Sequence, residues 1–153
     1  MTTERPSSLP HWLTVAGLVP FVGLSLSTIF LGNISDMGDW RDLSATALLL
    51  YAALIVSFLG GLRWGIALKA EPVDASSIIL SVLPSLLAWP LVLLGLAGMS
   101  GIALALSAGL IVLVYIWDRA AFKSGQLPSW FAPTRTLATL VAALSLILAA
   151  PFA

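Results

Sequence analysis

Residues 78–117 decide the fold, and they read IILSVLPSLLAWPLVLLGLAGMSGIALALSAGLIVLVYIW. These forty consecutive residues contain no charged side chain. A helix needs about 20 apolar residues to cross the hydrocarbon core of a membrane, so this length provides two crossings. The Gly-Met-Ser-Gly segment at 98–101 supplies the turn between them. The stretch therefore predicts a tight hairpin of two transmembrane helices.

The rest of the chain has the same apolar character. Of its 153 residues, 59% are hydrophobic and 9% are charged, whereas a soluble domain carries about 25% charged residues. The predicted spans number five, at about 11–31, 43–68, 78–97, 102–117 and 134–150. We therefore predict an all-α polytopic membrane protein with five transmembrane helices. It forms a single transmembrane domain over 1–153, in which residues 1–10 are a short cytoplasmic N-terminal segment.

The basic residues predict the direction of insertion. With a cytoplasmic N-terminus, six of the seven fall on the cytoplasmic side: Arg5, Arg63, Lys69, Arg119, Lys123 and Arg135. Positive residues in short loops resist translocation, so we predict the N-terminus inside and the C-terminus outside. The N-terminal segment has neither the basic start of a signal peptide nor the arginine-rich character of a mitochondrial presequence. A multi-pass protein of the bacterial inner (cytoplasmic) membrane is the resulting expectation.

Several kinds of site are excluded by the residues that the chain lacks. It has no cysteine and one histidine, His11, which excludes thiolate sites, multi-histidine metal sites and bis-histidine haem. The predicted spans hold no Asp, Glu or Lys for ion transport or for activating a serine nucleophile. The net charge is zero and no basic stripe indicates nucleic-acid binding. We expect no enzyme activity, no cofactor, no metal and no nucleic-acid partner.

Two predicted spans carry a row of small residues at four-residue spacing, which places each row on one helical face. The rows are Ser57–Gly61–Gly65 in the second span and Gly101–Ala105–Gly109 in the fourth. Small residues let helix backbones approach closely, which is the main route to tight packing in lipid. Both rows are therefore predicted helix-packing surfaces.

Proline residues interrupt two spans. Pro20 in the first span predicts a kink, because proline removes a backbone hydrogen bond that neighbouring groups must replace. Pro84 and Pro90 in the third span predict either simple kinks or a helix broken around a binding cavity.

Arg63 is the one charge well inside a predicted span, and such a residue is a candidate functional site. The alternative is structural, since Arg63 lies about 9 Å from the end of its helix and its side chain can reach the headgroups. Asp118 is expected at the same depth, where it either pairs with Arg63 or is an ordinary loop charge. Trp64, beside Arg63, is expected to anchor the helix at the interface or to stack on a flat ligand.

Four features together resemble a known family. They are the Leu-Pro-x-Trp start of the first span at Leu9, the Gly-Gly-x-Arg-Trp-Gly segment ending at Gly65, the prolines of the third span, and the Trp117-Asp118 pair. The sequence resembles a family of small bacterial inner-membrane proteins grouped as a domain of unknown function, which also includes the mitochondrial transmembrane protein sixty-nine of animals. The resemblance implies a polytopic membrane protein and supplies no substrate, cofactor or catalytic residue.

Two functional hypotheses follow from these patterns. The first is a non-enzymatic packing, assembly or interaction protein, because the small rows are suited to helix contacts and little of the chain lies outside the membrane. Its partners would be the lipid bilayer and either further copies of itself or a larger membrane complex. The alternative is a protein that binds or transports a small molecule, anionic lipid or anion through Arg63 and the nearby aromatic residues.

Overall fold

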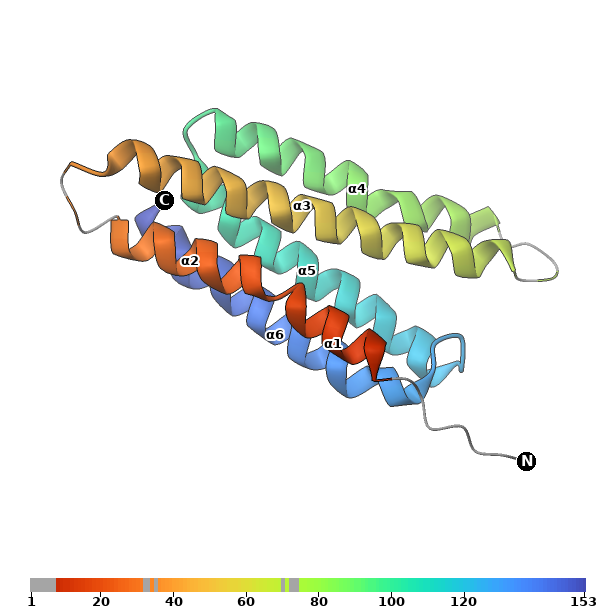
Figure 1. The fold of residues 1–153 in the computed structure, drawn as a ribbon. Helices are drawn as coiled ribbons and strands as arrows, with labels where there is room; N and C mark the ends of the chain where they lie inside the picture. Colours follow the sequence, from red (N-terminus) through yellow and green to blue (C-terminus); the bar gives the residue numbers. More distant parts are fainter. Residues whose placement is uncertain (1–7, 32–33, 35, 70, 72–74) are drawn as a thin grey trace.

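The computed structural model describes residues 8–31, 34, 36–69, 71 and 75–153, and the regular elements in this part of the chain are all helices. Figure 1 shows them as a bundle of long, roughly antiparallel helices. The elements are α1 (Leu9–Ala16), α2 (Val19–Leu31), α3 (Gly38–Leu68), α4 (Ala75–Leu96), α5 (Ser100–Lys123), the short 3₁₀ helix η1 (Ser129–Phe131), α6 (Ala132–Ala149) and the 3₁₀ turn η2 (Ala150–Phe152).

Within the described residues, five helical segments are long and apolar enough to cross a membrane. They are Leu9–Leu31, Gly38–Leu68, Ala75–Leu96, Ser100–Lys123 and Ser129–Phe152. The predicted fold class and the number of spans are confirmed. The helices extend further than the apolar runs, because a helix continues past the hydrocarbon core until a residue such as Gly125, with φ of +74°, ends it. Helix α1 begins inside the predicted N-terminal segment 1–10, whose first seven residues lie outside the described part.

The first span is divided into α1 and α2 by a break at Gly17 and Leu18. Pro20 explains the position, because a proline ring clashes with the carbonyl four residues earlier, and α1 ends at that residue, Ala16. The Tyr51 hydroxyl on α3 donates a 2.8 Å hydrogen bond to the Gly17 carbonyl at the break. The predicted kink, with a neighbouring group bonding to the exposed backbone, is confirmed. Helix α4 continues through both of its prolines.

The helices pack in a closed ring in the order α2, α3, α4, α5 and α6. Helix α3 also contacts α5 across the middle of this ring. The first and last spans close this ring, where the Ser25 hydroxyl donates to the Ser145 carbonyl at 2.8 Å. Large apolar side chains from α2, α3, α5 and α6 fill the centre: Phe21, Leu48, Val56, Leu104, Ile111 and Leu146.

Glycines allow three close helix contacts in this ring. A Cβ atom at Gly60 on α3 would lie 2.6 Å from the Ser81 carbonyl oxygen of α4. A Cβ at Gly101 on α5 would lie 2.5 Å from the Ala150 carbonyl oxygen, and a Cβ at Gly95 on α4 would overlap the Leu49 side chain. Gly60 and Gly101 need a residue without a side chain because backbone atoms occupy the space, whereas at Gly95 the obstacle is the end of the Leu49 side chain.

The predicted small rows are corrected by these contacts. Gly61 and Gly65 are exposed with no other atom of the protein near the place of a Cβ, and the same is true of Gly109. Ser57 and Ala105 are half-buried, and of the glycines in the two rows Gly101 alone makes a close helix contact. At Gly61, Gly65 and Gly109 the rows therefore do not pack closely against another helix of the described chain, and packing against a partner there stays a prediction. The face of α3 that packs inward carries Gly60, one residue away from the predicted row.

Candidate functional site

Three charged side chains are buried at the end of the bundle where α3 and α5 finish and where α1 and α6 begin (Figure 1). Arg63 on α3 is 8% exposed, Asp118 on α5 is 3% exposed and Arg135 on α6 is 6% exposed. No other charged residue in the described part of the chain is buried to this degree. Burying a charge is costly, so the contacts that these three side chains make need a full account.

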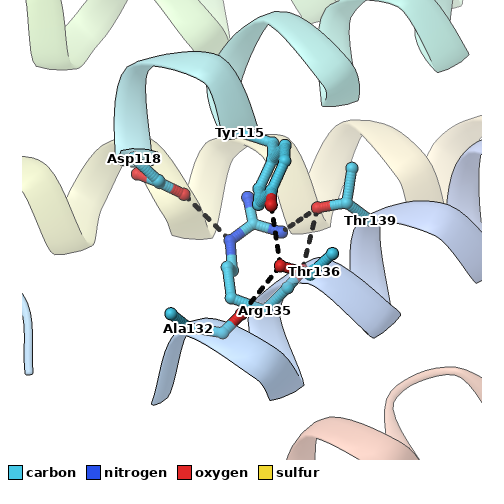
Figure 2. A network of polar contacts seen from close by, with 6 residues as sticks. All are labelled: Tyr115, Asp118, Ala132, Arg135, Thr136 and Thr139. Carbon is cyan, nitrogen blue, oxygen red and sulfur yellow. Dashed lines mark hydrogen bonds and ion pairs between the residues drawn. The ribbon is translucent and has the colours of Figure 1, made fainter. Parts of the chain in front are cut away.

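Asp118 and Arg135 form a buried ion pair between α5 and α6 (Figure 2). The Nε atom of Arg135 donates to the Asp118 carboxylate at 2.8 Å, and its Nη1 atom donates to the Thr139 hydroxyl at 2.8 Å. Thr139 in turn donates to the Arg135 carbonyl at 3.0 Å. The four-residue spacing on α6 places the Thr139 hydroxyl directly above the Arg135 side chain, which fixes the orientation of the guanidinium.

A second contact between α5 and α6 flanks this pair. The hydroxyls of Tyr115 and Thr136 lie 2.7 Å apart, and Thr136 also donates to the Ala132 carbonyl (Figure 2). The Arg135 guanidinium carbon lies 6.0 Å from the centre of the Tyr115 ring. The Nη2 atom of Arg135 is buried and has no hydrogen-bond partner among the described residues. A buried guanidinium nitrogen without an acceptor is unusual and needs an explanation.

Neither alternative for Asp118 is found: it forms no ion pair with Arg63 and is no loop charge, because it is buried in α5 and, among the described residues, pairs with Arg135. The Arg63 guanidinium stacks instead on the Trp117 ring, 4.2 Å from its centre, and its Nη1 atom has no partner in the described structure. Asp118 still attracts Arg63 through space. The second and fourth spans are neighbours, since α3 contacts α5. Trp64 is exposed.

An apolar groove of about 510 Å³ lies beside Arg135, between α1 and α3. Leu13 of α1 and Phe58 of α3 line its two sides and are each more than half exposed, so the groove opens on the outer surface of the bundle. Trp130, from the segment that joins α5 to α6, lines one end. Among the described residues that line the groove, Arg135 is the only charged one. A volume of this size lies within the range of small-molecule sites, which is about 300–1,000 Å³.

The break in the first span creates this groove. Helix α2 packs on α3 and α6, whereas α1 has no buried residue and packs mainly on α6. The Nδ1 atom of His11 and the Thr134 hydroxyl, 2.9 Å apart, join α1 to the start of α6. Because α1 leaves α3 at the break, the outer surface of α3 beside it is uncovered and forms one wall.

The groove and the buried Arg135 side chain together have the features of a binding site. No group of three or more metal-binding side chains occurs in the described part of the chain. The groove offers a long apolar lining and one fixed cation, which can hold and orient an amphipathic molecule. Sequence reasoning missed Arg135 as a site residue. The sequence does contain an indication of this pair. Asp118 and Arg135 stand on either side of the loop that joins two consecutive spans, so they lie at the same depth in the membrane.

Comparison with known proteins is consistent with this architecture. Residues 6–151 match a family described as "Protein of unknown function (DUF3429)". The chain is 37% identical over 140 residues to Transmembrane protein 69 of Xenopus tropicalis and 28% identical over 140 residues to that of Mus musculus. These matches cover 89% of this chain, but 51% and 53% of the two relatives, so the chain spans about half the length of the curated relatives that it matches. No solved structure matches the chain. The chain is therefore a multi-pass membrane protein that belongs to the DUF3429 family, whose members include animal Transmembrane protein 69.

Proposed function

We propose that the protein binds a lipid-like hydrophobic molecule in the groove between α1 and α3. The observation that carries this proposal is the apolar groove with one buried arginine in its lining. Along α6 the lining runs from Arg135 to Ala142, seven residues or about 10 Å of helix, which is long enough to take much of a hydrocarbon chain. Because the groove opens on the face of the bundle, such a molecule enters from the lipid without crossing water.

Native mass spectrometry of the protein purified in mild detergent tests this proposal. We expect a bound lipid-sized mass on the wild-type protein. Ala138→Phe should reduce its occupancy, because Ala138 lines the groove and a phenyl ring there fills the space. Ala120→Phe is the matched control, since Ala120 is exposed and lies outside the groove. A wild-type spectrum with protein alone, or equal occupancy in both variants, would contradict the proposal.

A second candidate function is assembly with another membrane protein or with further copies of the chain. The specific observation in its favour is the exposed small face of α3 at Gly61 and Gly65, which no other helix of the chain covers. A partner helix could approach closely there. Cross-linking in native membranes tests it. Gly61→Leu should remove the cross-linked species, whereas Gly38→Leu, an equally open position at the other end of α3, should leave it unchanged.

For the location, we propose the bacterial inner membrane, with the N-terminus in the cytoplasm. The distribution of basic residues supports this orientation, because most of those in the described chain lie at the same end of the bundle as the buried charge cluster. These residues are Arg63, Lys69, Arg119, Lys123 and Arg135. Arg41, at the start of α3, lies at the opposite end. The basic end faces the cytoplasm according to the positive-inside rule.

A further inference from the structure

The buried charges at the end of the bundle do not balance. Arg63 and Arg135 contribute two positive charges and Asp118 contributes one negative charge, so the buried charges of the described residues sum to +1. An uncompensated charge in an apolar environment costs several kcal/mol even after the protein relaxes. Glu71, the other acidic residue described at this end, is exposed and forms no ion pair with either buried arginine. A bound group with one negative charge would restore the balance.

The hydrogen bonds indicate where that group sits. Two of the three nitrogens of Arg135 already bind Asp118 and Thr139, and Nη2 has no acceptor. Arg63 likewise has an unpaired Nη1. Of the two arginines, only Arg135 is among the residues that line the groove, and Asp118 and Thr139 hold its guanidinium in place. Guanidinium groups prefer carboxylate and phosphate oxygens, which accept two parallel hydrogen bonds.

The position of Arg135 in its helix adds to this preference. Arg135 belongs to the first turn of α6, an 18-residue helix that begins at Ala132. The amino end of a helix carries a partial positive charge, which favours an anion in the same place. This end of the bundle is also where the apolar spans finish, so it lies at the depth of lipid headgroups and acyl carboxyl groups.

From these observations we infer that the groove selects an amphiphile with one negative charge, whose acid group binds Arg135 and whose hydrocarbon chain lies between α1 and α3. The inference rests on the proposed function and names the chemical class of its ligand. The acid group is either the carboxylate of a fatty acid or the phosphodiester of a phospholipid, since both carry one negative charge and suitable oxygens. The Asp118 carboxylate and Thr139 act as positioning groups that orient Arg135.

Binding of matched neutral and anionic probes to the full-length protein in detergent tests this inference. Oleic acid is compared with oleyl alcohol, and dioleoylphosphatidylglycerol with dioleoylglycerol, by native mass spectrometry. Charge-assisted hydrogen bonds contribute about 1.5–3 kcal/mol, so we expect at least about tenfold tighter binding of an anionic probe than of its neutral analogue. Preference in the oleic acid pair identifies a fatty acid as ligand, and preference in the phosphatidylglycerol pair identifies a phospholipid.

The variants separate the role of Arg135 from folding. The double variant Arg135→Gln/Asp118→Asn removes the ion pair as a whole, so neither member is left as an unpaired buried charge; the Arg63 charge remains, but Arg63 does not line the groove. It should bind the neutral probes as wild type does and lose the preference for anions. Arg135→Lys should retain part of this preference, and Arg41→Gln, at the opposite end, should retain all of it. Far-UV circular dichroism checks that each variant is folded.

Each remaining outcome contradicts one of the two proposals. Equal binding of anionic and neutral probes by the wild type overturns the inference and leaves the groove as a general apolar site. A preference that persists in the double variant also overturns it, because Arg135 would not be its source. Failure of the wild type to bind any probe overturns the proposed function itself.

Discussion

Removal of the Asp118 carboxylate should destabilise the protein strongly. In the folded protein this carboxylate lies 2.8 Å from the Arg135 Nε atom, and both side chains are buried. Asp118→Leu would leave the guanidinium buried with Thr139 as its remaining hydrogen-bond partner. Breaking a buried ion pair by removing one partner costs about 3–5 kcal/mol, most of which is the cost of the unpaired buried charge. Asp118→Asn should cost less, because its amide oxygen still accepts from Arg135.

The double variant Asp118→Leu/Arg135→Met provides the decisive comparison. It removes both charges, so its free energy of unfolding should be much closer to wild type than that of Asp118→Leu alone. Unfolding in mixed micelles by titration with sodium dodecyl sulfate, followed by far-UV circular dichroism, measures all variants. The exposed pair of Arg41 and Asp42 is the internal control, since Asp42→Leu should cost at most about 1 kcal/mol. A loss below about 1 kcal/mol for Asp118→Leu, or a double variant as unstable as the sum of its single variants, would refute this reasoning.

Three further predictions use other contacts of the structure. Gly60→Ala should lower the free energy of unfolding by about 1–3 kcal/mol, because the new methyl group meets the backbone of α4. Gly61→Ala, with open space beside it, should cause no loss of stability. Equal effects of the two substitutions would contradict the close packing of Gly60 against α4. Tyr51→Phe removes the donor to the carbonyl at the break between α1 and α2 and should cost about 0.5–1.5 kcal/mol in the same micelle titration. Alkaline phosphatase fused at Ala153 should be active and fused after Gln126 inactive in a bacterial host; the opposite result would reverse the proposed orientation.

The spans were predictable because their signal is local. Long runs without charge have no alternative to a membrane crossing, and the glycine at 98 marks the turn between the third and fourth spans. The ends of the helices were less predictable. The helix after 117 continues to Lys123 because polar residues form helix as readily outside the hydrocarbon core as apolar residues form it inside.

The inward face of each helix could not be derived from the sequence. In a soluble protein the apolar face is the buried face, but a membrane helix is apolar on the lipid side as well. Gly60 and Gly61 are neighbours of the same type, and spacing alone favoured Gly61. The structure buries Gly60 together with Val56, Arg63 and Ala67, which lie three or four residues apart along α3.

The partner of Asp118 was missed for a related reason. From the sequence Arg63 is the stronger candidate because it lies deep within a predicted span. Arg135 stands at the start of its span, where a basic residue predicts only the orientation of the protein. Consecutive antiparallel helices usually pack together, so the short loop between α5 and α6 was the better guide to the pair. The orphan nitrogens and the groove depend on exact side-chain positions and have no signal in the sequence.

The order of synthesis has a consequence for the buried ion pair. Asp118 and Arg135 are 17 residues apart, and the carboxylate leaves the ribosome first. At about 5–20 residues per second, translation provides its partner about 1–3 s later. During this interval α5 has emerged with an unpaired acidic residue near its end, and the ring of helices is still open because α6 is missing. The nascent chain therefore carries, for a few seconds, an unpaired charge that the insertion machinery must keep at the membrane surface. Pauses in translation within the loop at 124–128 should lengthen this period and increase degradation of the half-inserted chain.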